Sequence, residues 1–344
     1  MTNVVSYGGY YSTGGSIIRD MFREFEPNFE LPIEFRLLKE RFGLFELERV
    51  ISEDYAAENI DLAIRDFIWL TTNLARKSGW FKKAGFSYDM HTNGAFSVAT
   101  EEFIEEISDY QYPMSWHFYD FERTYLAQLS RRVKNKILTK NVRMKEGDTL
   151  ATMSYPGKEK FLLAARKYIN SILSGIQDVN GLKNNSVVGL HNAIPCFSTD
   201  LIDRGLAYFS SCKVILTDRD PRDVFVNYPK DSYGRYLPQG DDPMVKARAF
   251  VHFFKSIRKN QKAVSQHPNV LFLRFEDVCE NYDEIYDRII EFSGIDKGEH
   301  KNKGKIFSPK ESKKNIGMWR NATSDLAKAV SYIEEELDDY IYPS

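Results

Sequence analysis

A glycine-rich turn near the N-terminus has the residue types of an anion-binding loop. The stretch GGYYSTGGSII, residues 8–18, follows the β-branched run VVSY and precedes RDMFREF, which is typical of a helix. The first N–H groups of a helix are unpaired and attract anions, and glycines allow a ligand to approach the backbone closely. The pattern therefore favours a phosphate site, to which the Ser16 hydroxyl could add a donor. A tight turn without a ligand is the alternative.

The loop lacks the lysine that triphosphate chemistry uses. Aligned with the pattern G-x-x-x-x-G-K-[ST], the sequence has Gly9, Gly14 and Ser16 at the fixed positions and Gly15 in place of the lysine. In nucleotide-hydrolysing enzymes this lysine bridges the β- and γ-phosphates, while the Ser or Thr holds Mg²⁺. The loop is therefore compatible with a phosphate ligand but counts against a kinase or an ATPase.

A second candidate anion site lies two hundred residues later, in KVILTDRDPRDVFVNY, residues 213–228. A strand is predicted to end at Arg219, and Asp-Pro then begins a helix. Ligands of open α/β sheets bind outside the carboxyl ends of the strands, which is where Arg219 is expected. Asn227 follows about two helical turns later and could face the same pocket. A structural ion pair of Arg219 with Asp220 or Asp223 is the alternative.

The elements that must position these residues alternate between strands and helices. Apolar residues recur at helical spacing in four stretches, and Ser52 is expected to cap the first of them. Together with the strands this pattern predicts an α/β fold around a parallel sheet of about five strands. The predicted strands lie in residues 3–7, the start of 30–38, 186–192, 213–219 and 270–277, and the predicted helices in 60–74, 161–173, 245–257 and 282–290.

The predicted strands leave a long gap in the chain. Residues 40–185 contain helical patterns and turns but no convincing strand, so we expect a mostly helical insertion within a single domain of residues 1–344. The stretch 294–315 is polar, basic and glycine-bearing, and is expected to be a loop.

In order along the chain, these motifs resemble the sulfotransferases that use 3′-phosphoadenylyl sulfate (PAPS). In that family an arginine, an Asn/Asp-Pro-Arg/Lys-Asp core and a serine bind the 3′-phosphate, and the match is close from Val214 to Tyr228, with Asn227 in the serine position. GGYYSTGGSII resembles the 5′-phosphosulfate loop, VLFLRFEDVCENYDEIYDRIIEFSGI the late strand and helix, and SKKNIGMWRNATSD the C-terminal loop that closes on the 3′-phosphate. The resemblance covers about residues 3–38 and 186–325.

The resemblance implies a P-loop-like three-layer fold, PAPS as the co-substrate and no metal. It also implies which residues bind the donor: those of the loop, of the arginine motif and of the C-terminal closing loop. These residues are Ser12, Thr13, Gly14, Gly15, Ser16, Ile17, Arg219, Asn227, Lys313, Lys314, Trp319 and Arg320.

Two residues compete for the role of the base that takes the proton of the acceptor hydroxyl. His191 ends the strand SVVGLH and resembles the histidine of the cytosolic branch of the family; its pKa suits the role. Glu34, in FELPIEFRLL, resembles the glutamate of the carbohydrate-modifying branch and needs only to lie near the hydroxyl. Each could instead be structural: His191 as a hydrogen-bonded residue at a strand end, Glu34 in an ion pair with Arg36 or Arg41.

The sequence departs from the family at one position of the loop. The family has a lysine or arginine that contacts the leaving oxygen just before the Ser/Thr-Gly of the loop, and here that position is Ser12. The alternatives for this cation are Arg19 in the following helix, Lys313 or Lys314 in the closing loop, and Lys140 or Arg143 in the insertion.

Composition limits the class of protein. The chain has 344 residues, 42% of them hydrophobic and 28% charged, with a net charge of −2, which argues against a protein that binds nucleic acid by broad phosphate neutralisation. Its three cysteines have no metal-binding spacing, no apolar run reaches the length of a membrane span, and the N-terminus begins directly with a predicted strand. We therefore expect a cytoplasmic protein.

The predicted function is transfer of a sulfuryl group from PAPS to a hydroxyl, with a saccharide as the expected acceptor because the sequence diverges from the cytosolic phenol and steroid branch. A small hydroxylated metabolite or lipid is the next alternative. Aromatic residues crowd residues 110–125, where acceptor stacking competes with a role in the core. The rival functions are a P-loop kinase-type phosphotransferase and a non-catalytic member of the fold that binds a nucleotide or glycan.

Overall fold

The structure is a computed structural model of the whole chain. It describes residues 2–53, 56–77, 85–113, 116, 126, 129, 150–183, 186–228 and 236–343. The described chain divides into two compact units. Unit 1 comprises residues 1–39, 88–96 and 169–344, and unit 2 comprises residues 40–87 and 97–168.

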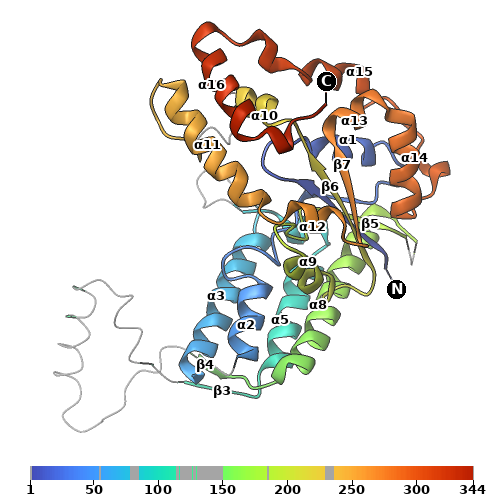
Figure 1. The fold of residues 1–344 in the computed structure, drawn as a ribbon. Coiled ribbons are helices and arrows are strands. Elements are labelled where there is room, and N and C mark those ends of the chain that lie inside the picture. The colour runs from blue at the N-terminus through green and yellow to red at the C-terminus, as the bar shows by residue number, and fades with distance from the viewer. Residues whose placement is uncertain are drawn as a thin grey trace. The chain divides into compact units, whose positions relative to one another are not determined.

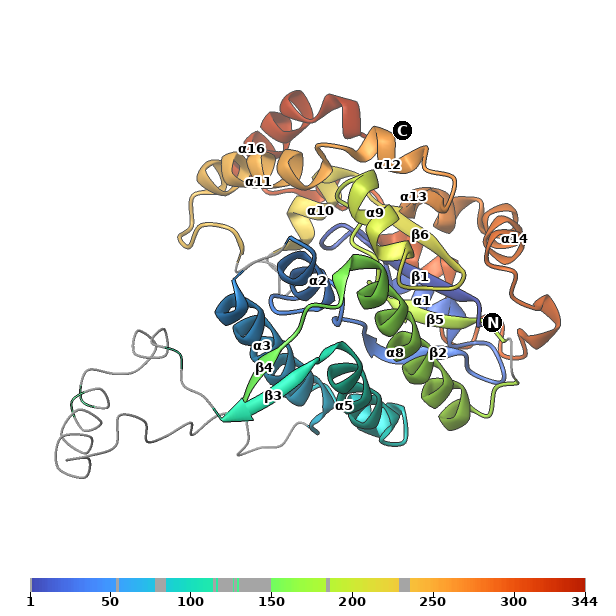
Figure 2. The same cartoon turned by 90° about the horizontal axis from the view of Figure 1, so that it is seen from below.

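Unit 1 is built on one sheet of five strands that all run parallel, in the order β2-β5-β1-β6-β7. Figure 1 labels β5, β6 and β7, and Figure 2 labels β2, β5, β1 and β6. The α/β fold and the five-stranded parallel sheet predicted from the sequence are therefore confirmed, with β1 central. The strands are β1 Val4–Gly9, β2 Glu30–Glu34, β5 Val188–His191, β6 Cys212–Asp218 and β7 Val270–Arg274.

The apolar strand residues explain why helices cover the sheet. Val5 and Tyr7 of β1 and Ile215 of β6 are almost fully buried in one core cluster with side chains of α1, α13 and α14. In Figure 2, α9 lies in front of the strands and α1 behind them, so the sheet is the middle layer. A second cluster joins α10, α11 and α16 around Phe250, which is fully buried.

The helices of unit 1 begin with α1 Ser16–Phe22, α4 Tyr88–His91, α9 Thr199–Leu206, α10 Pro221–Asn227, α11 Pro243–Arg258, α12 Gln261–Ser265, α13 Phe275–Glu280 and α14 Tyr282–Ser293. The C-terminal part adds α15 Pro309–Ser312, α16 Ser324–Glu336 and the 3₁₀ turns η3 Lys297–Glu299, η4 Lys313–Asn315, η5 Met318–Asn321 and η6 Asp338–Tyr340.

Unit 2 is mostly helical, but it also contains a short ladder. Its elements are α2 Leu44–Ser52, α3 Ala57–Ala75, α5 Ala95–Ile107, the antiparallel strands β3 Tyr110–Pro113 and β4 Leu150–Met153, and the first part of α8 Gly157–Asn180. The expectation that residues 40–185 lack strands is therefore wrong. Each strand has four residues, and β3 ends in proline, which is too short and irregular for a strand pattern to be recognised.

Two further local expectations need correction. Ser52 is the last residue of α2 and not the cap of the next helix, which begins after Ala56. The stretch 294–315, expected to be a loop, contains the short helical segments η3, α15 and η4 with irregular chain between η3 and α15, and its middle is held by one buried carboxylate. Glu24 accepts hydrogen bonds from the N–H groups of Ile306 (2.7 Å) and Phe307 (2.8 Å) and contacts His300 Nε2 at 2.8 Å.

Candidate active site

The carboxyl ends of the five parallel strands share one edge of the sheet, and most of the predicted site residues lie along it. The loop that follows β1 stands at the centre, where the strand order changes direction, because β5 and β2 lie on one side of β1 and β6 and β7 on the other. This is the position at which open α/β sheets bind ligands.

The loop after β1 is braced by the neighbouring strand. The buried Thr13 hydroxyl donates to the carbonyl of Tyr10 at 2.5 Å and approaches that of Thr217 in β6 at 2.9 Å, while the Thr217 hydroxyl donates to Gly8 O at 2.9 Å. A Cβ on Gly9 would lie 2.7 Å from Thr217 Oγ1 and closer still to Thr13 Oγ1, so this close packing requires glycine. The side chain of Thr13 therefore shapes the loop and faces the protein.

The backbone of the loop leaves an anion cradle. Ser12 and Gly14 have φ values of 58° and 86°, which turn the chain before α1, and Gly15 is the N-cap of that helix. The N–H of the buried Ile17 donates to Gly14 O at 3.0 Å, whereas no protein partner exists among the described residues for the N–H groups of Gly14, Gly15 and Ser16. Successive unpaired N–H groups in a turn form a concavity that suits a phosphate or sulfate oxygen.

Arg219 is buried directly after β6. Its side chain is 5% exposed, its guanidinium carbon lies 4.8 Å from the centroid of the Phe275 ring, and its Nη2 donates to the carbonyl of Asn315. Its Nε is buried without any hydrogen-bond partner among the described residues. Burial lowers the pKa of Arg219, and the charge of Asp223, 3.9 Å away, opposes that effect. A buried donor without a partner is costly, so this atom is a natural place for a ligand oxygen.

The closing loop packs on the arginine motif. One carboxylate, that of Asp223, accepts from the N–H groups of Gly317 at 2.8 Å and Trp319 at 3.2 Å. Burial raises the pKa of Asp223, and the Gly317 N–H and Arg219 counteract it. Arg219 and Asp223 thus hold the same turn, which spans residues 315–319.

The other predicted donor-binding residues lie around this turn. The Trp319 ring lies 4.0 Å from the guanidinium carbon of Arg222, and Arg320 is exposed beside it. Asn227 is half-buried at the end of α10, one turn after Asp223, so both stand on the same face of that helix. Lys313 and Lys314 form ion pairs with Glu280 at 3.5 Å and with Glu311 at 2.6 Å.

The structure brings the two candidate bases together. Glu34 and His191 end the neighbouring strands β2 and β5 and occupy paired positions in the ladder. The His191 ring stacks on Tyr7 of the central strand, with ring centroids 5.4 Å apart. Neither ring nitrogen of His191 has a hydrogen-bond partner in the part of the chain that the structure describes. By contrast, the Glu34 carboxylate accepts from Lys39 Nζ (2.8 Å), Arg36 Nη2 (3.1 Å) and Asn192 Nδ2 (3.2 Å).

Electrostatics separate the two groups. Burial lowers the pKa of His191 to about 4; the Glu34 charge opposes this shift, and Arg19 and Lys39 add to it. Burial alone would raise the pKa of Glu34, but Lys39 and then Arg36 lower it to about 2. At neutral pH the site therefore holds a neutral imidazole beside a carboxylate whose charge is compensated.

Comparison with known proteins decides the family. The family model described as "Sulfotransferase domain" matches residues 115–324, which is more than half of the chain. The chain belongs to the sulfotransferase domain family. Enzymes of this family take the sulfuryl group from PAPS. No curated protein matches the sequence.

Several solved structures resemble this sulfotransferase at low sequence identity. The sulfotransferase domain from the curacin biosynthetic pathway is 11% identical, with a TM-score of 0.44, and the alignment covers 100% of this chain and 99% of that one. The sulfotransferase domain of the Synechococcus PCC 7002 olefin synthase is 12% identical, with a TM-score of 0.44 and coverages of 100% and 98%. Sulfotransferase STF9 from Mycobacterium avium is 11% identical, with a TM-score of 0.39 and coverages of 98% and 75%.

The features of the site fit the donor of the sulfotransferase family. PAPS carries two separated anionic groups, a 3′-phosphate and a 5′-phosphosulfate. Among the described residues, the buried Arg219 after β6 has an Nε without a partner, and the turn after the adjacent strand β1 has three unpaired N–H groups. Among the described residues, no cluster of three or more His, Cys, Asp or Glu side chains is placed to hold a metal ion.

Sequence reasoning missed three side chains of the candidate site. Lys39 and Asn192 both bind Glu34, and Asp223 holds the closing loop; Lys39 lies only five residues after Glu34, a spacing that could have signalled a local ion pair. Lys140 and Arg143, two of the expected alternatives for the cation, lie outside the described residues, as do Phe118, Phe121 and Tyr125 of the aromatic segment.

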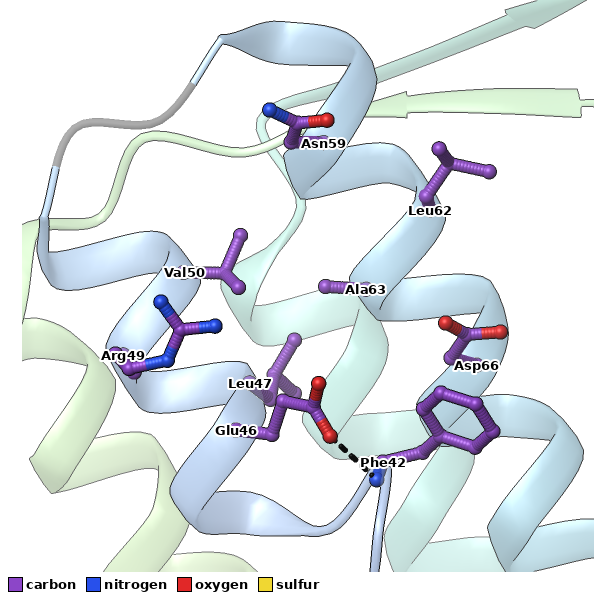
Figure 3. A pocket seen from close by; sticks show the side chains of 9 residues that line it. All are labelled: Phe42, Glu46, Leu47, Arg49, Val50, Asn59, Leu62, Ala63 and Asp66. Atoms are coloured by element: carbon purple, nitrogen blue, oxygen red, sulfur yellow. Dashed lines mark hydrogen bonds between the residues drawn. The ribbon is translucent and has the colours of Figure 1, made fainter. Parts of the chain in front are cut away.

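Unit 2 contains a cavity of about 250 Å³ between α2 and α3. Figure 3 shows Arg49 of α2 and Asp66 of α3 on facing helices, with the Phe42 ring at one end. Leu47, Val50, Leu62 and Ala63 supply apolar surface, and Glu46 and Asn59 complete the lining. None of the helices in the described ranges is long and apolar enough to cross a bilayer.

Proposed function

We propose that this sulfotransferase moves the sulfuryl group of PAPS to a hydroxyl of a saccharide acceptor. The observation that carries the proposal is that two donor sites at one sheet edge have no partner among the described residues: the buried Nε of Arg219 and the N–H groups of residues 14–16. A ligand with two anionic groups satisfies both, and the absence of a loop lysine at Gly15 argues against a triphosphate.

The donor-binding residues divide between the two anionic groups. Arg219, Asn227 and the closing loop with Lys313, Lys314, Trp319 and Arg320 are proposed to surround the 3′-phosphate. Ser12, Thr13, Gly14, Gly15, Ser16 and Ile17 are proposed to form the cradle of the 5′-phosphosulfate, mainly through the backbone. The support is that Arg219 and Asp223 hold residues 315–319, while Thr13 holds the loop.

His191 is proposed as the base, with Glu34 as the residue that positions its neighbours. A ring nitrogen of His191 accepts the proton of the acceptor hydroxyl while the hydroxyl oxygen bonds to sulfur and the bond from sulfur to the 5′-phosphate breaks. The support is electrostatic: His191 is neutral at pH 7, whereas Glu34 is engaged by three donors and has a pKa of about 2. The Glu34 charge stabilises the imidazolium that forms.

The lining of the cavity in unit 2 supports a saccharide as the acceptor. Carboxylates, a guanidinium group, an amide and the aromatic ring of Phe42 surround about 250 Å³. Polyhydroxylated rings combine many hydrogen-bonding groups with apolar faces, and such a mixed lining suits both. We propose further that residues 1–344 form a single sulfotransferase-like domain with a helical insertion. Three free cysteines support a cytoplasmic, reducing location.

The experiment is transfer from [³⁵S]PAPS to a panel of oligosaccharides, phenols and hydroxylated lipids. Label appearing in a saccharide but not in the phenols supports the proposal, and label in phenols or lipids alone contradicts the choice of acceptor. An absence of transfer together with tight binding of adenosine 3′,5′-bisphosphate would favour a non-catalytic binding protein. Transfer of ³²P from [γ-³²P]ATP by the same preparation would favour a kinase-type enzyme.

A further inference from the structure

Sulfuryl transfer leaves negative charge on the bridging oxygen, which stays with the 5′-phosphate. A preorganised cation at that oxygen is an effective way to stabilise the transition state. The loop itself supplies no cation at Ser12 or Gly15. The described cations that act on His191 at this sheet edge are Arg19, Arg23 and Lys39.

The other cations considered for the bridging oxygen are already engaged in ion pairs or exposed. Arg23 is committed to the buried carboxylate of Glu30, at 2.5 Å. Arg19 lies 3.4 Å from Asp20 on α1. In the closing loop, the Lys314 side chain is 67% exposed and paired with Glu311.

Lys39 is connected to the first residues of the loop through one shared acceptor. Its ammonium group and the Asn192 amide donate to the same oxygen of Glu34, Oε1, at 2.8 and 3.2 Å. The Asn192 side chain in turn packs so closely on Gly8 that a Cβ there would overlap its Oδ1. Because Gly8 is the penultimate residue of β1, two positions before the loop, this network places Lys39 near the start of the loop.

An electrostatic effect on Cys196 agrees with this position of Lys39. The Tyr10 hydroxyl donates to the carbonyl of Cys196 at 3.1 Å, so Cys196 lies against the loop. Burial raises the pKa of the Cys196 thiol to about 12, and the Lys39 charge opposes that rise. The Lys39 charge thus acts on His191, whose ring stacks on Tyr7 of β1, and on Cys196, which accepts from Tyr10.

The Lys39 side chain also has capacity left for a ligand. It is 24% exposed, and an ammonium group has three donors, of which one is used by Glu34 in the described structure. A lysine can rotate its donors toward a new acceptor while it remains charged.

We propose that Lys39 donates to the bridging oxygen of the 5′-phosphate and stabilises the charge that forms there when the bond to sulfur breaks. The inference rests on the proposed function. Lys39 keeps its proton throughout: the electron pair of the broken bond stays on the phosphate oxygen, and the acceptor proton goes to His191. Glu34 holds the ammonium group in place.

The test compares two ligands that differ only in the 5′-phosphate. Dissociation constants are measured by calorimetry for adenosine 3′,5′-bisphosphate and for adenosine 3′-phosphate, with the wild type, Lys39→Met and the control Lys297→Met. Lys297 belongs to an exposed ion pair of the same kind, with Asp287. Lys39→Met should lower the affinity for the bisphosphate by about tenfold or more, since a charged hydrogen bond is lost. It should leave the affinity for adenosine 3′-phosphate unchanged, and Lys297→Met should change neither affinity.

Lys39→Arg should restore most of the affinity for the bisphosphate, because the charge returns, and circular dichroism shows whether each variant is folded. If a folded Lys39→Met loses affinity equally for both ligands, Lys39 has a structural role and the inference is overturned. Unchanged affinity for the bisphosphate would also overturn it. If the wild type binds neither ligand, the proposed function fails. If it binds both and Lys39→Met behaves like the wild type, only the inference about Lys39 fails.

Discussion

Glu34 and His191 lie at paired positions on the neighbouring strands β2 and β5, although 156 residues separate them along the chain. The carboxylate is held by Lys39, Arg36 and Asn192, whereas the imidazole ring nitrogens have no hydrogen-bond partner among the described residues. This asymmetry assigns different roles to two residues that the sequence presents as rivals. It favours His191 as the proton acceptor and Glu34 as the residue that orients the surrounding donors.

The first prediction concerns these roles. His191→Gln should lower kcat by about 100-fold or more, because general-base catalysis typically contributes that much. Glu34→Gln keeps the imidazole and should cost less, on the order of tenfold, through loss of its charge near the imidazolium. Single-turnover rates with saturating PAPS measure both. A larger loss for Glu34→Gln, with His191→Gln close to the wild type, would exchange the two roles.

The second prediction concerns acid stability. The folded pKa of His191 is about 4, below the value of about 6.5 for an unfolded chain, so the unfolded state binds the proton first. The contribution of His191 to the free energy of unfolding is fully present above about pH 6.5. It is lost as pH falls toward 4, by at most roughly 3 kcal/mol. Denaturant unfolding at pH 5 and 7.5 measures the loss.

His191→Gln should reduce this dependence on pH, since glutamine does not titrate. The exposed His252 offers a matched control, and His252→Gln should unfold with the pH dependence of the wild type. A His191→Gln variant that loses as much stability between pH 7.5 and 5 as the wild type would contradict the assignment of a neutral, buried His191.

The third prediction separates binding from stability at Arg219. Arg219→Met should lower the affinity for adenosine 3′,5′-bisphosphate by about 100-fold, because a buried charged donor to a phosphate is lost. Without ligand the melting temperature should also fall, because Asp223 stays buried without its ion-pair partner, so affinities are compared at a temperature at which circular dichroism shows the variant folded. The control Arg288→Met, in an exposed position on α14, should change neither quantity. Full affinity in Arg219→Met would remove Arg219 from the donor site.

The fourth prediction concerns the closing loop. Asp223→Asn removes the charge and one acceptor from the group that binds the N–H groups of Gly317 and Trp319. Hydrogen exchange of amides 315–320 should become faster, and affinity for the bisphosphate should fall severalfold. Asp325→Asn, on the exposed start of α16, is the control. Unchanged exchange rates in Asp223→Asn would show that other contacts hold the turn.

The strands of the sheet could be predicted because each is a buried apolar run, and parallel strands covered on both faces have that pattern. The loop after β1 and Arg219 could be assigned to the same edge for the same reason. Residue positions that depend on which distant strands pair with each other could not be predicted from the sequence. Nothing in the stretches around Glu34 and His191 indicates that β5 inserts between β2 and β1, which is what brings the two residues together.

Local patterns also failed where packing outweighs propensity. Thr13 has the residue type of a ligand donor, yet its hydroxyl is used to fix the loop to β6. Lys39 looks like an ordinary charged residue after a strand, and only its shared acceptor with Asn192 connects it to the loop. Such contacts combine segments far apart in sequence, so residue type and spacing do not reveal them.

The central claim is that the sheet edge binds the donor of a sulfotransferase, and a thermal-shift measurement tests it most directly. Ligands that bind only the native state raise the melting temperature, by an amount that grows with their concentration relative to Kd. Adenosine 3′,5′-bisphosphate without Mg²⁺ should raise the melting temperature by several degrees, and ATP with Mg²⁺ should not. Stabilisation by ATP with Mg²⁺ but not by the bisphosphate would contradict the account.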